Sequence, residues 1–162
     1  MPGQPLTNAL TIDVEDYFQV SAFAPYIARD RWDACECRVE RNVERILLML
    51  EEMHTRATFF TLGWIAERYP ALVKEIVARG HELASHGYGH LRASDQTPDS
   101  FREDLAVAKA ILEDTGGVAV TGYRAPRSRN SPENTPPATL LPRMPEMAVV
   151  DTSSVVDSRV DA

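Results

Sequence analysis

Residues 8–16 read NALTIDVED, a short apolar run that ends in a cluster of acids. Such a run is typical of a buried β-strand, here over residues 8–14, and its carboxyl end carries Asp13, Glu15 and Asp16. Three carboxylates this close together repel one another unless they are solvated or hold a cation. The stretch therefore predicts an interior strand that ends at a chemically active surface.

Helices and further strands alternate after this first strand. Apolar residues at helical spacing predict a helix over residues 39–53, and β-branched and aromatic residues predict a strand over residues 56–62. The series continues with a helix from Pro70 to Gly80, a strand over residues 81–85, a helix from Pro98 to Gly116 and a strand over residues 118–123. This alternation predicts βαβ units, and hence an α/β fold with a parallel sheet or barrel.

The pattern changes near the end of the chain. Residues 124–162 contain no glycine, lysine or aromatic residue, and five of the 11 prolines lie between Pro132 and Pro145. Such a segment has few side chains whose burial could offset the entropy of ordering it. We therefore expect a domain over residues 1–127 and a poorly ordered tail over residues 128–162, with one weak strand candidate at Met147–Val150.

The net charge and the composition indicate which classes of partner the protein can bind. The net charge of −7 argues against nucleic acid and against anionic lipid surfaces, whereas a neutral sugar polymer or a small molecule is compatible with it. No secretory signal and no apolar run long enough to span a membrane is visible, so we expect a cytoplasmic protein without membrane insertion. Cys35 and Cys37 are expected to be reduced loop cysteines.

Two histidines lie in the run SHGYGH, residues 85–90, just after the third predicted strand. If this loop turns helically, the spacing of His86 and His90 places both imidazoles on one face. Because the carboxyl ends of parallel strands form the ligand face, these histidines and the acids of the first strand should share one opening. Two histidines and one carboxylate are typical of a catalytic divalent metal. The alternative is that the acids and the histidines are separate, solvated clusters.

A remaining carboxylate can act as general base toward a water molecule. The run GYRAP, residues 122–126, follows the fourth predicted strand at the same face. Arg124 could hydrogen-bond the base carboxylate and keep it ionised. Without the other motifs, Arg124 would be interpreted as a surface arginine before a turn.

Four segments together resemble the polysaccharide deacetylase family, carbohydrate esterase family 4, with its NodB homology domain. They are LTIDVEDYFQV, ATFFTLGWIAERYP, GHELASHGYGH and GYRAP, in family order and spacing over about residues 8–127. The first segment is similar to the branch linked to bacterial exopolysaccharide export, whose first motif reads DVED. The resemblance implies a distorted (β/α) barrel, here incomplete, and metal-dependent hydrolysis of carbon–nitrogen bonds that removes acetyl groups from N-acetylated sugars.

The resemblance also implies a role for each site residue. Asp13 matches the catalytic base and Arg124 matches the arginine that orients it. His86 and His90 match the metal-binding histidines, and the expected ion is zinc, with cobalt or another divalent ion as alternatives. The acidic ligand is Glu15 or Asp16, and Glu15 is favoured because alternate strand residues share a face.

The resemblance weakens toward the end of the chain. Family members carry two further motifs downstream, one of them a histidine that acts as general acid, but no histidine follows His90. From Ser128 onward the sequence does not resemble the family, which predicts a truncated or frame-altered C-terminal part. The alternative function is an inactive remnant that binds metal or glycan without turnover. The expected partners are an N-acetylated polysaccharide or oligosaccharide and the exopolysaccharide biosynthesis and export machinery.

Overall fold

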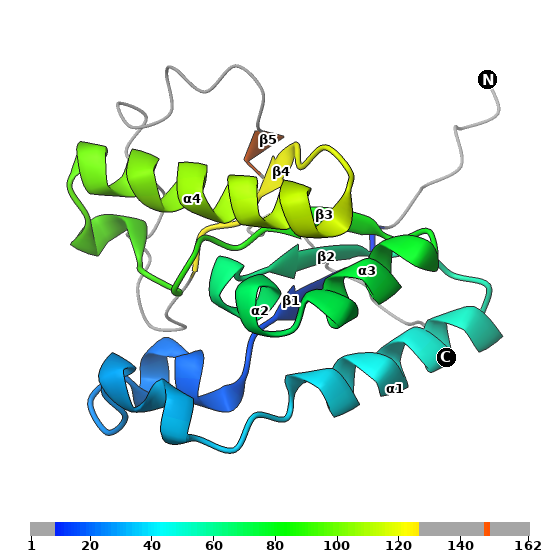
Figure 1. Cartoon of the computed structure of the whole chain (residues 1–162), viewed down its shortest axis with the longest axis horizontal. Coiled ribbons are helices and arrows are strands. Elements are labelled where there is room, and N and C mark those ends of the chain that lie inside the picture. Colours follow the sequence, from blue (N-terminus) through cyan, green and yellow to red (C-terminus); the bar gives the residue numbers. More distant parts are fainter. Residues whose placement is uncertain (1–8, 127–147, 150–162) are drawn as a thin grey trace, which may run out of the picture.

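The computed structural model describes residues 9–126 and 148–149, and their strands form one parallel sheet. In spatial order the strands are β1 (Thr11–Val14), β2 (Thr58–Thr61), β3 (Glu82–Ser85), β4 (Gly122–Tyr123) and β5 (Ala148–Val149) (Figure 1). Each strand lies beside the one before it in the chain, as in a barrel, whereas the strand order of a doubly wound sheet reverses at a switch point. The predicted α/β fold is confirmed, and its sheet is an incomplete barrel.

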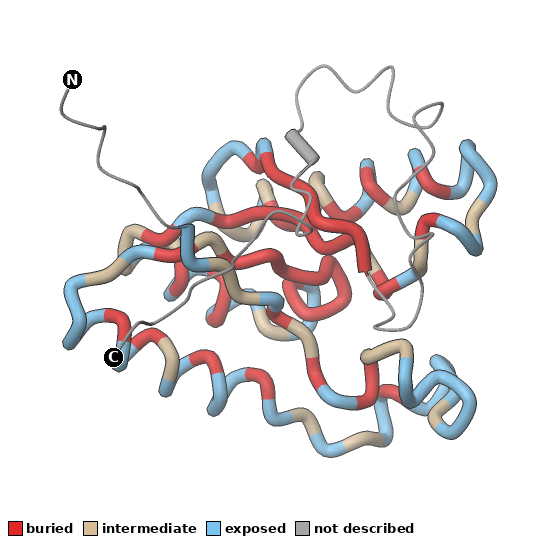
Figure 2. Tube along the Cα trace, turned by 180° about the vertical axis from the view of Figure 1, so that it is seen from behind, coloured by how far each residue is buried: buried red, intermediate tan, exposed pale blue. Residues whose placement is uncertain are grey.

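Four α-helices connect and cover the strands, namely α1 (Val39–Glu52), α2 (Gly63–Arg68), α3 (Pro70–Ala78) and α4 (Pro98–Gly116). Figure 1 shows α2 and α3 in front of the sheet, and α4 packs against both helices and against β3. Seen from behind in Figure 2, the strands are largely buried and the outer sides of α1 and α4 are exposed. The helices therefore cover the sheet with their apolar faces.

The predicted helix over residues 39–53 forms as α1, with its boundaries nearly as expected. It buries Val39, Val43, Leu47 and Leu50, which follow one another at intervals of four, four and three residues. These side chains join a core cluster that includes Phe59 from β2. Burial of each large aliphatic side chain contributes roughly 1.5–3 kcal/mol relative to an exposed position, so this face fixes α1 to the sheet.

Several predicted boundaries differ from the structure. The first strand is Thr11–Val14 and the fourth is only Gly122–Tyr123, both shorter than the sequence pattern suggested. Helix α2 was not predicted, because its six residues are too few to show a helical period. The connection after β1 contains three 3-10 helices, at Tyr17–Gln19, Ser21–Phe23 and Arg29–Ala34.

The long helix α4 begins and ends as its sequence signals predict. Thr97 accepts a hydrogen bond from the Ser100 N–H, Pro98 occupies the first turn, and Gly117 adopts the left-handed conformation at the end. Of the predicted tail, residues 148 and 149 form β5 beside β4, and the rest of residues 128–162 lies outside the described residues. Among the described residues, no helix has the length and apolar character needed to cross a membrane.

Candidate metal and catalytic site

Three side chains from two strand ends converge at the carboxyl edge of the sheet. Glu15 follows β1, His86 follows β3, and His90 lies four residues further on. One ligand atom from each lies within 4.8 Å of the others. His90 Nε2 is 2.8 Å from Glu15 Oε2, and His86 Nε2 is 3.9 Å from the same oxygen. The acids of the first strand and the two histidines thus share one opening.

The proton of His86 is located by its hydrogen bond. His86 Nδ1 is 2.9 Å from the backbone carbonyl oxygen of Arg124, and because a carbonyl only accepts, Nδ1–H donates. In the neutral ring, Nε2 then presents a lone pair toward Glu15. Glu15 Oε2 is buried, and despite its closeness to His90 it has no hydrogen-bond partner among the residues that the structure describes. Lone pairs that converge in this way fit a divalent cation.

The protonation states of these residues also suit a metal. Burial raises the pKa of Glu15, but the contact with His90 and the charges of both histidines outweigh it and hold the pKa below the ordinary value of 4.5. Burial lowers the pKa of His86 below 6.5, although the charges of Asp13 and Glu15 oppose this shift. A carboxylate and a neutral imidazole are the forms that bind metal ions. Glu15, His86 and His90 would hold the ion and leave further coordination positions open.

Asp16, the other acid considered as a ligand, makes a different set of contacts. Its Oδ1 accepts a hydrogen bond from the Tyr17 N–H at 2.8 Å. Its Oδ2 accepts from the N–H groups of Arg38 and Val39, the latter at 2.9 Å. Asp16 therefore caps the first 3-10 helix and ties it to the start of α1. The structure brings Glu15, not Asp16, to the two histidines.

Asp13 and Arg124 form an ion pair beside this cluster. Arg124 Nη1 donates to Asp13 Oδ1 at 2.6 Å, and Nη2 donates to Thr11 Oγ1 at 2.6 Å. The guanidinium carbon lies 4.1 Å from the centre of the Phe60 ring. Arg124 is buried, whereas 36% of the Asp13 side chain is exposed. Arg124 thus holds one carboxylate oxygen and leaves the other available to accept a proton.

Helix α2 supports the loop that carries the histidines. Its first two residues, Gly63 and Trp64, donate their N–H groups to the carbonyl oxygens of Gly87 and Tyr88, each at 2.9 Å. The first N–H groups of a helix have no partner within the helix, so they are free to bind other carbonyls. The unpredicted helix α2 therefore fixes the backbone of residues 87–88.

A second support comes from α4. Asp104 Oδ2 accepts a hydrogen bond from the Tyr88 N–H at 3.1 Å. In this loop Gly87 and His90 have φ values of 80° and 55°, and positive φ is unfavourable for a residue with a side chain. A histidine held in this region is strained, and such strain is concentrated at functional sites. The loop is therefore held in a specific conformation by its neighbours.

Asp104 was not predicted as a site residue, although the sequence carries a signal for it. Asp104 lies three residues after Phe101 and four before Ala108, which are buried residues of α4. A carboxylate on the apolar face of a helix needs a partner. Burial raises the pKa of Asp104, and the hydrogen bonds from the loop backbone act in the opposite direction.

Other residues discussed from the sequence lie away from the site. Cys35 and Cys37 are free thiols in the connection before α1. His81 is buried at the other end of β3, where its Nδ1 accepts the Ala57 N–H at 3.3 Å. This contact joins the residue before β3 to the residue before β2, which is a structural role.

Comparison with known proteins agrees with this architecture. A model of the polysaccharide deacetylase family matches residues 31–138, two thirds of the chain. The chain belongs to the polysaccharide deacetylase family. The matched range includes His86, His90 and Arg124, while Asp13 and Glu15 precede it. The family membership that the four sequence segments predicted is thereby confirmed.

Two individual relatives are peptidoglycan deacetylases. A peptidoglycan-N-acetylglucosamine deacetylase of Bacillus cereus is 34% identical over 82 residues, which are 51% of this chain and 30% of that protein. A peptidoglycan deacetylase of Helicobacter pylori is 33% identical over 87 residues, which are 54% of this chain and 30% of that protein. This member of the family thus matches about a third of the length of these relatives.

The same fold is found in a solved structure, that of the peptidoglycan deacetylase PdaC from Bacillus subtilis. The TM-score is 0.65 at 20% sequence identity, and the match covers 88% of this chain and 56% of PdaC. At this identity the likeness establishes the fold alone. It agrees with the consecutive parallel strands of the sheet.

Proposed function

We propose that this polysaccharide deacetylase family member is a metal-dependent hydrolase that removes acetyl groups from N-acetylated sugars in a polysaccharide. The observation that supports it best is the convergence of Glu15, His86 and His90 beside the Asp13–Arg124 pair. A bound divalent ion, with zinc as the first candidate, supplies Lewis-acid activation of the acetyl carbonyl and of water. The peptidoglycan deacetylases among its relatives favour a cell-wall or related glycan as substrate.

The other steps of the proposed reaction are assigned to side chains of the protein. Asp13 takes the proton from the attacking water with the carboxylate oxygen that Arg124 does not hold. Arg124 keeps this carboxylate ionised and oriented, and its carbonyl keeps His86 in the Nδ1–H tautomer. Partial exposure of Asp13 lets a substrate reach it, whereas Arg124 is buried and stays fixed.

A second candidate function follows from the sequence. Residues 91–162 contain no histidine, whereas the family resemblance implies one that acts as general acid. The alternative is therefore a protein that binds metal or glycan without turnover. A cytoplasmic location and a connection with exopolysaccharide biosynthesis and export stay predictions.

Acetate release from chitotetraose by the zinc-loaded chain tests the proposal, together with the variant Asp13→Asn. The variant keeps the size of the side chain but cannot act as a base, so turnover should fall by roughly 10²–10⁴-fold. Zinc affinity should stay near that of the wild type, because Asp13 is not among the three converging ligands.

Two results would decide against the proposal. Equal turnover of the wild type and of Asp13→Asn would remove Asp13 from the mechanism. Stoichiometric zinc binding without any acetate release from the wild type would favour the alternative of binding without turnover.

A further inference from the structure

Arg29 begins the third 3-10 helix and reaches the loop that carries the candidate metal ligands. The space beside Gly89 is occupied by its guanidinium, so a Cβ atom at position 89 would collide with Arg29 Nη1. Gly89 directly precedes His90. The Arg29 guanidinium therefore lies directly against the backbone of the residue before His90.

The Arg29 guanidinium packs on the face of an aromatic ring. Its carbon lies 4.8 Å from the centre of the Trp32 ring, a cation–π contact. Trp32 is buried, and its ring packs edge-on against that of Trp64 with a centroid distance of 5.7 Å. Trp64 belongs to α2, the helix that also supports the histidine loop. Arg29 and the helix α2 are thus linked through the same pair of aromatic rings, those of Trp32 and Trp64.

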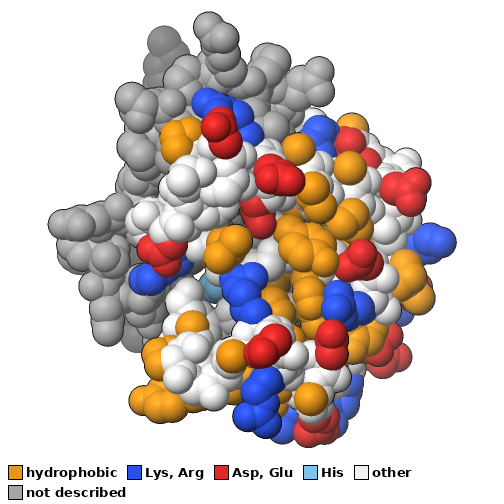
Figure 3. Space-filling view, turned by 60° about the vertical axis from the view of Figure 1, so that its left-hand side comes forward, with side chains coloured by type: hydrophobic (Ala, Val, Ile, Leu, Met, Phe, Trp, Pro, Cys, Tyr) orange, Lys and Arg blue, Asp and Glu red, His pale blue; other side chains and the backbone are white. Residues whose placement is uncertain are grey.

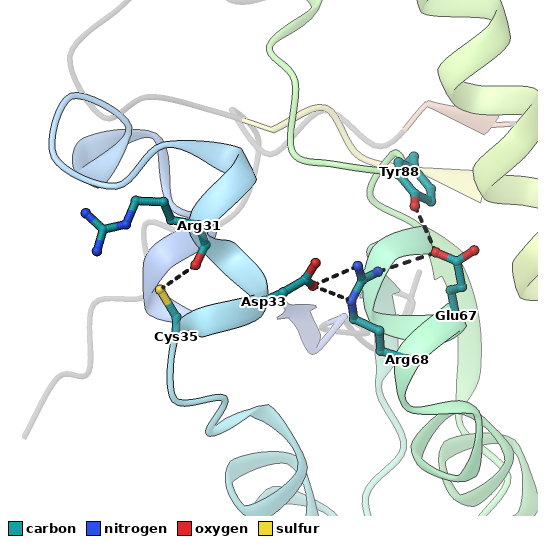
Figure 4. Close-up of polar contacts among 6 residues, drawn as sticks. All are labelled: Arg31, Asp33, Cys35, Glu67, Arg68 and Tyr88. Carbon is teal, nitrogen blue, oxygen red and sulfur yellow. Dashed lines mark hydrogen bonds and ion pairs between the residues drawn. The ribbon is translucent and has the colours of Figure 1, made fainter.

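The helix that bears Arg29 is also tied to α2 by polar contacts. Arg68 donates two hydrogen bonds to Asp33 Oδ1, at 2.8 and 3.0 Å, and contacts Glu67, which accepts from the Tyr88 hydroxyl at 2.8 Å (Figure 4). This chain of contacts runs from the 3-10 helix to the histidine loop. Arg29 is therefore positioned relative to His90 before any ligand binds.

The donors of Arg29 have no acceptor within the described part of the chain. Among the described residues no hydrogen bond or ion pair involves its guanidinium, and Arg29 is exposed as a residue. Burial lowers the pKa of Arg29, and the negative charge of Asp104 opposes this shift. The two side chains are nevertheless too far apart to form an ion pair. In Figure 3 a histidine is visible at the surface, and both Lys or Arg and Asp or Glu side chains lie near it. An arginine that is held in place without an acceptor is suited to an external ligand.

We propose that Arg29 binds a carboxylate of an acidic sugar that neighbours the N-acetylated unit in the substrate. This inference rests on the proposed deacetylase function and names its substrate class as an N-acetylated glycan with a carboxylate on the neighbouring sugar. The net charge of −7 disfavours a densely charged polyanion, so the carboxylate is recognised locally, by one arginine. The planar guanidinium offers parallel N–H donors that match the two oxygens of a carboxylate, whereas a sugar hydroxyl uses only one donor.

Calorimetric titration of the zinc-loaded full chain with two tetrasaccharides of equal length tests this inference. One alternates N-acetylglucosamine with glucuronic acid, and the other is chitotetraose. A charge-assisted bidentate contact should make the acidic tetrasaccharide bind roughly 10–100-fold more tightly. Arg29→Gln should reduce the ratio of the two affinities to about one. Arg29→Lys keeps the charge but lacks the two parallel N–H donors, so it should retain part of the preference for the acidic tetrasaccharide.

Arg31→Gln is the matched control, since it removes the same charge from the same 3-10 helix. Figure 4 shows the Arg31 side chain directed away from the contacts with α2. This variant should keep the wild-type preference for the acidic tetrasaccharide.

The outcomes separate this inference from the proposed function. Equal wild-type affinity for both tetrasaccharides, or an unchanged preference in Arg29→Gln, would overturn the inference alone. Absence of binding by both tetrasaccharides would overturn the proposed function and this inference with it.

Discussion

Replacing Gly87 with alanine should weaken the candidate metal site without changing any of its ligands. Gly87 has a φ value of 80°, and placing a residue with a Cβ in the left-handed region costs about 1–2 kcal/mol. The new Cβ would also lie 2.8 Å from Asp104 Oδ2. Displacing Asp104 would remove its hydrogen bond from the Tyr88 N–H, which contributes roughly 1 kcal/mol. Together the variant should lose about 2–3 kcal/mol of stability.

The same displacement should lower metal affinity, because residues 87–89 connect the two histidines. Disturbed support of metal ligands typically costs roughly 10–100-fold in affinity. We expect this loss for Gly87→Ala in zinc competition with a chromophoric chelator. The melting temperature of the metal-free protein should fall by roughly 5–10 °C, from about 2–4 °C per kcal/mol for a chain of this size.

Gly117→Ala provides the matched control. Gly117 also has a positive φ, of 66°, but no atom of the described residues lies within 4 Å of the position that a Cβ would take. It ends α4, far along the chain from the histidine loop. This variant should lose about 1–2 kcal/mol of stability with unchanged zinc affinity. If Gly87→Ala binds zinc as tightly as Gly117→Ala does, the reasoning about the loop is wrong.

Three further predictions concern single features of the structure. The double variant His86→Ala/His90→Ala should abolish stoichiometric zinc binding, measured by metal analysis after dialysis. Burial, together with the charges of nearby arginines, lowers the pKa of His81 below 6.5. The stability that neutral His81 contributes is therefore present above pH 6.5 and lost as the pH falls below that value. In urea unfolding, His81→Asn should lose less stability than the wild type as the pH falls through this range. Arg124→Lys should reduce acetate release by roughly 10²-fold, the size of a positioning effect, while zinc affinity persists.

The fold could be predicted largely because its signals are local. The spacing of buried residues in α1 and the cap, proline and terminal glycine of α4 are each visible within a few residues. Short elements were predicted poorly. β4 has two residues and pairs with β3 only at Ser85 and Tyr123, so its extent depends on neighbouring strands and not on its own sequence. Helix α2 follows β2 after a single residue, and no periodic pattern separates the two.

The candidate site likewise contains residues that could be predicted from local sequence and residues that could not. Glu15, His86 and His90 could be found from spacing, because the ends of parallel strands meet at one edge. The choice between Glu15 and Asp16 also followed from strand alternation, although the backbone groups that Asp16 binds could not be seen in the sequence. Arg29 gives no sequence signal at all, since its position depends on the aromatic cluster beneath it.

Arg124 shows why the candidate base and the candidate metal ligands should act together. Its side chain holds Asp13, its carbonyl oxygen accepts from His86 Nδ1, and its own N–H donates to the Ser85 carbonyl at 3.0 Å. One residue at the end of β4 thus connects the end of β1 with the start of the histidine loop. A lysine would keep both backbone contacts but lose the fixed orientation of Asp13, because it cannot donate to Asp13 and Thr11 from two arms at once. Loss of turnover with retained metal in Arg124→Lys would therefore separate the orientation of the base from the support of the metal ligand.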